Sequence, residues 1–225
     1  MDESIRKKNI ILAMVVLGSI CGLIEVAVKG LLNQKGIHLS GLIIGLDFIV
    51  IGIALAIYQK PLLILGMGFI VCLCKQLVVP LLGLSFMCQV NSCLAIMLEF
   101  GAFAAIASFT FDKMKKSVGS RILSAGIGVF TVSILFYFIG IHVRPCPYLL
   151  SFNIPGGFIS FIAKEGIVWA IFAAALFPLG WAIGERLKGK IFELVLQRPR
   201  FYYAGVALVT IFCWFGCAIA IYSGV

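Results

Sequence analysis

The chain has 225 residues, of which 62% are hydrophobic and 12% are charged, and its formal net charge is +9. Soluble domains are about 45–50% apolar and ~25% charged, so this composition excludes a soluble globular protein and indicates an integral membrane protein. In a soluble protein such a charge would suggest nucleic acid as a partner. In a membrane protein basic loops set the topology instead, so we expect the lipid bilayer and no nucleic acid.

Seven apolar runs predict an all-α, polytopic membrane bundle of six to seven transmembrane helices, since a span needs about 20 apolar residues. The first run follows charged residues and lacks a cleavage site of small residues, which indicates a retained helix. Pro61 starts the third run, because proline is tolerated at a helix start and disfavours helix just before it. We place the spans at 10–31, 40–59, 61–82, 88–111, 121–143, 158–184 and 202–222.

Charge or turn-forming residues mark the remaining connections. Residues 112–121 are predicted to be a charged loop, and 144–157, with three prolines and two adjacent glycines, a loop with turn chemistry. Segment 185–201 is polar, with apolar residues at helical spacing, which predicts a short amphipathic helix on the cytoplasmic membrane surface. The expected organisation is a six-helix core over 1–184, this linker, and an additional transmembrane helix within 202–225.

The distribution of Lys and Arg predicts the orientation. If the N-terminus is cytoplasmic, every inside segment is basic, as the positive-inside rule requires. The inside residues are Arg6, Lys7, Lys8, Lys60, Lys113, Lys115, Lys116, Arg121, Arg186, Lys188, Lys190, Arg198 and Arg200. The other basic residues are Lys29, Lys35, Lys75, Arg144 and Lys164. We therefore expect a multi-pass protein of the cell membrane.

The charges inside the predicted spans all fall in their outer halves. A charged side chain at mid-depth costs at least ~2.5–3.5 kcal/mol unless it is paired or wetted, and unrelated salt bridges would have no reason to prefer one leaflet. We therefore predict an outward-facing pocket for a small polar or zwitterionic solute, with loops 32–39 and 144–157 as lids and Trp169 as an apolar wall. Its candidate residues are Glu25, Lys29, Asp47, Lys75, Gln76, Asn91, Glu99, Arg144, Lys164, Glu165 and Trp169.

The alternative interpretation of this cluster is internal pairing. Glu25 and Lys29 are spaced i,i+4 on one helix, and Lys75 could pair with Glu99 across the hairpin that joins the third and fourth spans. In that case the charges hold the helices in register and bind nothing.

The sequence predicts no catalytic residue, metal site or cofactor. His38 and His142 are too few for two bis-histidine haems. Residues 184–191 imitate a phosphate-binding loop, but Ile191 stands where Ser or Thr should hold magnesium, and no strand precedes it. Gly18/Gly22 and Gly41/Gly45, each pair spaced i,i+4, are expected to permit close helix packing.

In size, orientation and outer polar cluster, residues 10–184 resemble the substrate-binding S component of an energy-coupling factor (ECF-type) vitamin transporter. The resemblance implies capture of a vitamin or precursor from outside, with a transmembrane coupling subunit and ATPases as partners. That family often carries Ala-x-x-x-Ala in its first span for contact with the coupling subunit, where this chain has Ala13 and the Gly18/Gly22 pair. The seventh span, which would place the C-terminus outside, also departs from the family.

Three classes of function follow from these patterns. The first is a transport component that binds a small solute, with a proton-coupled carrier acting through Glu99 as its variant. The second is a membrane enzyme at the outer face, either lipid-modifying or a thiol oxidoreductase using Cys88, Cys93 and Cys146. The absence of Cys-x-x-Cys weighs against the thiol enzyme. The third is an anchor subunit of a larger complex, and we expect transport ahead of the other two.

Overall fold

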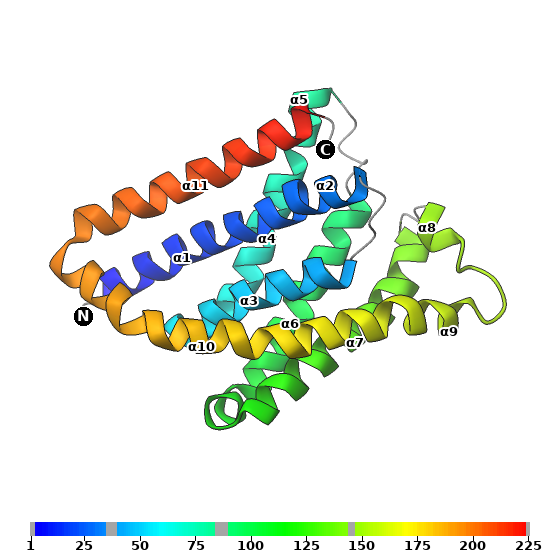
Figure 1. Cartoon of the computed structure of the whole chain (residues 1–225), viewed down its shortest axis with the longest axis horizontal. Coiled ribbons are helices and arrows are strands. Elements are labelled where there is room, and N and C mark those ends of the chain that lie inside the picture. The colour runs from blue at the N-terminus through cyan, green and yellow to red at the C-terminus, as the bar shows by residue number, and fades with distance from the viewer. Residues whose placement is uncertain (1–2, 35–39, 84–89, 144–146, 224–225) are drawn as a thin grey trace.

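The computed structural model describes residues 3–34, 40–83, 90–143 and 147–223, and within these ranges it contains helices and no strand. Two of the helical stretches, η1 and η3, are short π-helical turns that continue into neighbouring α-helices. In chain order (Figure 1) the elements are α1 Glu3–Leu23, η1 Ile24–Val28, α2 Lys29–Gln34, α3 Ser40–Tyr58, α4 Leu62–Gln76, α5 Val78–Leu82, α6 Val90–Lys116, α7 Val118–Val143, α8 Pro147–Leu150, α9 Gly157–Phe161, η3 Ile162–Gly166, α10 Ile167–Gln197 and α11 Pro199–Tyr222.

Seven helical stretches in the described part of the chain are long and apolar enough to cross a membrane, which confirms the predicted all-α class and the number of apolar helices. They are Lys8–Leu32, Ser40–Tyr58, Leu62–Leu82, Val90–Lys116, Val118–Val143, Gly157–Gln197 and Pro199–Tyr222. Large apolar side chains lie exposed along α11, for example Leu208, Ile211 and Phe215. Such a surface suits contact with lipid, whose hydrocarbon tails are as apolar as these side chains. The cytoplasmic position of the N-terminus stays a prediction.

The most buried of the seven apolar helices is α3, which lies along α10, while α1 packs on α4 and α6 packs on both α4 and α7. The close approach of α3 and α10 depends on glycines. A Cβ at Gly52 would lie 2.6 Å from the carbonyl oxygen of Phe177, and one at Gly180 would lie 2.1 Å from that of Ile49. The last helix, α11, covers α1 at one edge of the bundle (Figure 1).

The glycine pairs predicted from the sequence have the expected role. A Cβ at Gly18 would lie 2.9 Å from the carbonyl oxygen of Met67, and Gly22 lies against Cys74, so both glycines face α4. Gly41 and Gly45 face α10 in the same way. Small residues let helix backbones approach closely in a membrane, and these two pairs allow α1 and α3 to do so.

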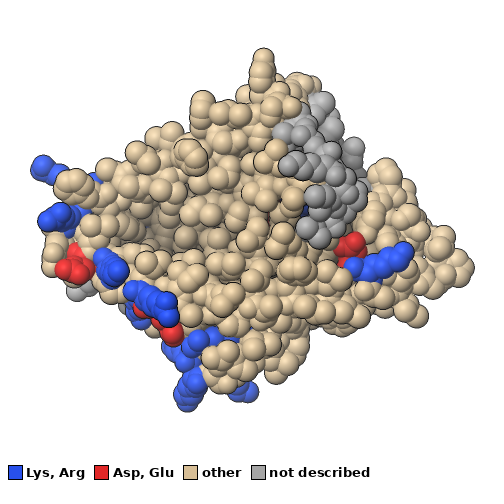
Figure 2. All heavy atoms as spheres, viewed as in Figure 1, with Lys and Arg blue, Asp and Glu red and all other residues tan. Residues whose placement is uncertain are grey.

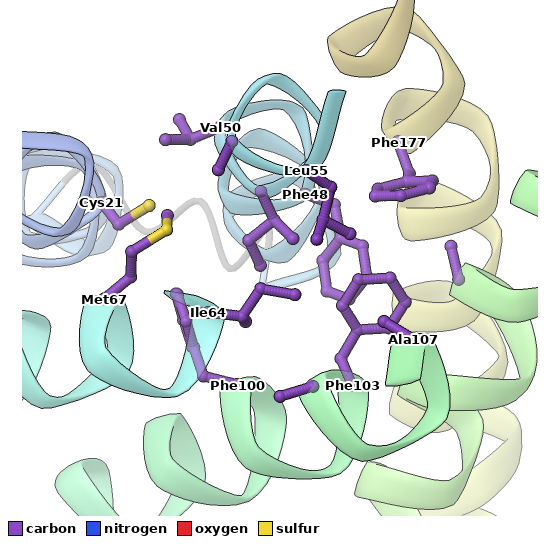
Figure 3. Packing of buried hydrophobic residues seen from close by; sticks show 14 of the residues in the cluster. Cys21, Phe48, Val50, Leu55, Ile64, Met67, Phe100, Phe103, Ala107 and Phe177 are labelled. Atoms are coloured by element: carbon purple, nitrogen blue, oxygen red, sulfur yellow. The ribbon is translucent and has the colours of Figure 1, made fainter. Parts of the chain in front are cut away.

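The centre of the core is aromatic. Phe48, Phe103 and Phe177 come from α3, α6 and α10 and are fully buried. Their ring centroids are 4.7, 5.3 and 6.1 Å apart in edge-on arrangements, as Figure 3 shows. Edge-on aromatic pairs contribute about 0.5–1.5 kcal/mol beyond the area they bury. This cluster therefore fixes the relative positions of three helices that also carry the polar residues described below.

Two connections differ from the sequence prediction. The expected loop 112–121 is a break at Ser117 alone, since α6 runs to Lys116 and α7 starts at Val118. Arg121 makes this tight turn favourable, because its Nε donates to the carbonyl oxygen of Met114 at 2.7 Å and so satisfies a carbonyl at the end of α6. Segment 185–201 is helical as far as Gln197, as a direct continuation of α10 rather than a separate short helix. Lysine, glutamate and leucine are good helix formers, so the helix has no local reason to stop where the apolar run ends.

Basic side chains gather at one end of the molecule. Figure 2 shows most of the visible Lys and Arg where α10 meets α11 and where α6 meets α7. At this end Arg121 pairs with Glu185 at 3.3 Å and stacks on Trp181, with its guanidinium 4.6 Å from the ring centroid. The asymmetry in charge that the sequence predicts is therefore a property of the folded bundle.

Candidate functional site

A buried ionic group lies where η1, α2, α4 and α6 meet, and it consists of Glu25, Lys29, Lys75 and Ser92. The ammonium of Lys75 is 2.6 Å from Oε2 of Glu25, and that of Lys29 is 3.2 Å from the same oxygen. Lys75 also donates a hydrogen bond to the Ser92 hydroxyl at 2.5 Å. The Glu25 and Lys75 side chains are only 4% and 8% exposed, whereas Lys29 is 38% exposed. One carboxylate thus neutralises part of the charge of two lysines.

Glu25 reaches this position from a π-helical turn. Residues Ile24–Val28 form η1, which interrupts the α-helix between α1 and α2. A π-turn adds a residue to the helical repeat and shifts the side chains that follow it around the helix, and such turns occur frequently at functional sites. At this break Glu25 faces Lys75 of α4, and nothing in the apolar sequence around Glu25 indicated it.

Two further carboxyl groups, those of Asp47 and Glu99, lie in the same region and interact electrostatically with Glu25. Asp47 is fully buried and Glu99 is 6% exposed. Among the described residues, no cation is within ion-pair distance of either group, and no hydrogen-bond partner meets either oxygen of Asp47 or Oε1 of Glu99. The Cys21 thiol lies beside Asp47, but a thiol is a weak donor. These two acids are the carboxyl groups of the site that have no ionic partner among the described residues.

Two predicted amides are also incompletely satisfied. Gln76 follows Lys75 on α4 and adjoins the ionic group, whereas Oδ1 of Asn91 faces Gly140 of α7. Gln76 donates through Nε2 to the Cys93 sulfur at 3.4 Å. Its Oε1, and Oδ1 of Asn91, are buried and meet no partner within the described ranges. Buried polar atoms are hydrogen-bonded in the great majority of cases. The orphaned acceptors of Asp47, Glu99 and Gln76 therefore indicate a site that awaits hydrogen-bond donors.

A second polar group, centred on Glu165, lies at the start of α3 and α10. Its carboxylate accepts hydrogen bonds from the Ser40 hydroxyl at 2.6 Å, from the Trp169 indole at 2.8 Å and from the Tyr148 hydroxyl. Glu165 lies in η3, so Glu25 and Glu165 are both presented by π-helical turns. Ser40 precedes Asp47 by two turns of α3, which separates the two groups by about 10 Å along that helix.

The structure thus divides the predicted site into two parts. Glu25, Lys29, Asp47, Lys75, Gln76 and Glu99 belong to the first part, and Glu165 and Trp169 to the second. Asn91 belongs to neither, since its Oδ1 faces Gly140 of α7. Lys164 is exposed and lies 5.8 Å from the centroid of the Phe152 ring. Trp169 packs against both hydrophobic clusters, and its indole donates hydrogen bonds to Glu165 and Ser40. Arg144, Cys88, Cys146, His38 and most of the predicted lid 32–39 lie outside the described residues.

The two pairings proposed from the sequence have different outcomes. The pair between Glu25 and Lys29 is confirmed at 3.2 Å. The pair between Lys75 and Glu99 is absent from the described structure, because the Lys75 ammonium lies against Glu25 and Ser92 instead. Internal pairing therefore explains three of the charges and leaves Asp47 and Glu99 unexplained.

Several residues of these groups were not predicted. Ser92, Cys21, Ser40 and Tyr148 contribute partners, but each is a single polar or sulfur-bearing residue without a distinctive pattern around it. The cysteines give no metal site, since the described residues contain no cluster of three or more His, Cys, Asp or Glu side chains suited to a metal ion.

No known protein family, curated protein or solved structure matches this chain. The arrangement defines a helical bundle of membrane-spanning length with a closed polar site between its helices, and its function has to be argued from that site.

Proposed function

We propose that this protein is a membrane transport component that binds a small solute in the polar site between α1, α3, α4 and α6. The observation that carries the proposal is the pair of unsatisfied acids, Asp47 and Glu99, beside the buried ionic group. An ionised carboxylate removed from water costs several kcal/mol unless a partner compensates it. Ionisable groups at membrane depth in proteins mark ligand and ion pathways by default.

The composition of the site indicates the chemistry of the solute. The two lysines already share Glu25, so the net requirement is for positive charge and for hydrogen-bond donors. Asp47 and Glu99 would accept an ammonium or another cationic group, while the free oxygen of Gln76 would accept a hydrogen bond from it. Lys29, which is partly exposed, is the group best placed to meet a carboxylate on the same molecule. A cationic or zwitterionic solute satisfies all of these groups together.

The source of energy is the second part of the proposal. The resemblance to ECF-type S components favours a separate coupling subunit with ATPases. In this structure the Gly18/Gly22 surface of α1 is covered by α4, so a coupling subunit would need another surface. The alternative is a proton-coupled carrier in which a proton and the solute's cation compete for Glu99.

Binding to the purified protein in detergent or nanodiscs tests the proposal. The panel would contain water-soluble vitamins, their precursors, amines and amino acids. A ligand at one hundred times its Kd stabilises the folded state by about 2.7 kcal/mol, which for a chain of this length raises the Tm by roughly 5–10 °C. Calorimetry then gives the Kd for each compound that raises the Tm.

Isosteric variants make the test specific to the two acids. Asp47→Asn and Glu99→Gln each remove one charge and should raise the Kd by about 10–100-fold, since a hydrogen bond to a charged group contributes about 1.5–3 kcal/mol. Glu193→Gln is the matched control, because Glu193 is exposed near the end of α10 and its one hydrogen bond to a described residue comes from Gln197. A Kd that changes equally in all three variants would contradict binding at this site.

The second candidate function is an anchor subunit, and the mutual saturation of Glu25, Lys29 and Lys75 favours it. An anchor has no use for a solute. If no compound of the panel raises the Tm and both Asp47→Asn and Glu99→Gln destabilise the protein, the charges serve helix packing alone and the transport proposal fails.

A further inference from the structure

A small cavity lies at the basic end of the bundle, between the beginning of α1, the end of α3 and the late part of α10. Its volume is about 130 Å³, and its polar wall is formed by Asn9, Tyr58, Gln59 and Lys188. Ile57 and Phe192 line its apolar side. This cavity is remote from the polar site described above, and the inference drawn from it is independent of the proposed function.

Asn9 shows that the cavity is incomplete without a ligand. Its side chain lines the cavity, and the residue is 4% exposed. Both the Nδ2 donor and the Oδ1 acceptor are buried and have no hydrogen-bond partner among the described residues. An amide can make up to four hydrogen bonds, and a buried one without any is rare in native proteins. The missing partner has to be both an acceptor and a donor.

The charges around the cavity select for an anion. Lys188 is half-buried in its wall and forms no ion pair or hydrogen bond with the described residues, and none of the side chains that line the cavity is acidic. The two acids nearest to Lys188 on α10 are already engaged, Glu185 by Arg121 and Trp181 and Glu193 by Gln197. The cavity also lies at the end of the molecule where Lys and Arg gather (Figure 2).

The size of the cavity restricts what enters it. Pockets for drug-sized ligands have volumes of about 300–1,000 Å³, so this one admits a single polar group rather than a whole metabolite. Its location at the ends of membrane-spanning helices places it at the depth of lipid headgroups, and basic pockets between such helices bind anionic headgroups. Its apolar wall can meet the first carbons of a lipid.

We propose that this cavity binds the phosphate-bearing headgroup of an anionic phospholipid. Lys188 neutralises the phosphate, Nδ2 of Asn9 donates a hydrogen bond to a phosphate oxygen, and Oδ1 of Asn9 accepts one from a headgroup hydroxyl. A bound lipid would satisfy every orphaned polar atom of the cavity and tie α1 to α10 at the basic end.

Native mass spectrometry of the full-length protein in detergent tests this proposal. The probes are phosphatidylglycerol, phosphatidylcholine with the same acyl chains, and glycerol phosphate without acyl chains. The wild-type protein should bind phosphatidylglycerol in preference to phosphatidylcholine, and glycerol phosphate far more weakly. If glycerol phosphate binds as tightly as phosphatidylglycerol, the phosphate comes from a soluble molecule and the lipid assignment is overturned.

Three variants locate the binding. Lys188→Gln should weaken phosphatidylglycerol binding by about tenfold, as expected for loss of one charge-assisted contact, and Asn9→Leu should also reduce it. Lys190→Gln is the matched control, because Lys190 is exposed on the same helix outside the cavity. The affinity of this variant for phosphatidylglycerol should stay within about twofold of wild type. Equal losses in Lys188→Gln and Lys190→Gln would show diffuse attraction and overturn the site. Lys188→Gln alone decides the question if Asn9→Leu fails to fold.

Discussion

The contact between Glu25 and Lys75 provides the sharpest test of the structure. In Lys75→Met the Glu25 carboxylate keeps only Lys29, at 3.2 Å and 38% exposed, in place of a buried ammonium at 2.6 Å. Breaking a buried pair by removing one partner costs about 3–5 kcal/mol. Because Lys29 remains, we expect a loss near the lower limit, about 3 kcal/mol in the free energy of unfolding.

The double variant Glu25→Gln/Lys75→Met removes both charges together. Replacing a buried ion pair by neutral side chains is often neutral or stabilising, so the double variant should be more stable than Lys75→Met. The double-mutant cycle should give a coupling energy of about 2 kcal/mol or more, within the range found for residues in contact.

Reversible unfolding in mixed micelles with increasing sodium dodecyl sulfate measures these free energies. The control cycle uses Lys115 and Asp112, an i,i+3 pair at 3.4 Å whose side chains are 40% and 88% exposed. Its coupling energy should be at most about 0.5 kcal/mol. The reasoning is refuted if both cycles give the same coupling energy, or if Lys29→Met costs as much as Lys75→Met.

Three further predictions concern other parts of the bundle. Arg121→Lys should lower the free energy of unfolding by about 2 kcal/mol, because lysine lacks the planar fork that donates to backbone carbonyls and to Glu185, while the exposed Arg186→Lys should change it by less than about 0.5 kcal/mol. Gly180→Ala should cost about 2–3 kcal/mol by overpacking α3 against α10. Gly205→Ala, where an added Cβ meets nothing within 4 Å, should stabilise by about 0.5–1 kcal/mol. Asp47→Leu should stabilise the ligand-free protein by roughly 1–3 kcal/mol and abolish solute binding, and a destabilised variant would contradict an unsatisfied Asp47.

The helices were largely predictable, because the free energy of transferring an apolar run from water into the membrane depends only on the composition and length of that run. The connections between the helices were harder to predict. Ser117 replaces a predicted ten-residue loop because Arg121 reaches back to the end of α6, a contact between side chain and backbone that no local propensity reports. The continuation of α10 through 185–197 could not be predicted, because polar residues with high helix propensity are compatible both with a longer helix and with a separate short one.

The sequence by itself determined that this is an all-α bundle of seven apolar helices, with basic residues at one end and buried charges toward the other. Only the tertiary structure decided which charges meet. The π-turn at η1 and the packing of α1 on α4 bring Glu25 to Lys75, so Glu99 and Asp47 are left without an ionic partner within the described ranges. Hydropathy is a sum over single residues, whereas a pairing depends on the rotation and contact of helices far apart in the chain, and one residue added to a helical turn is enough to change it.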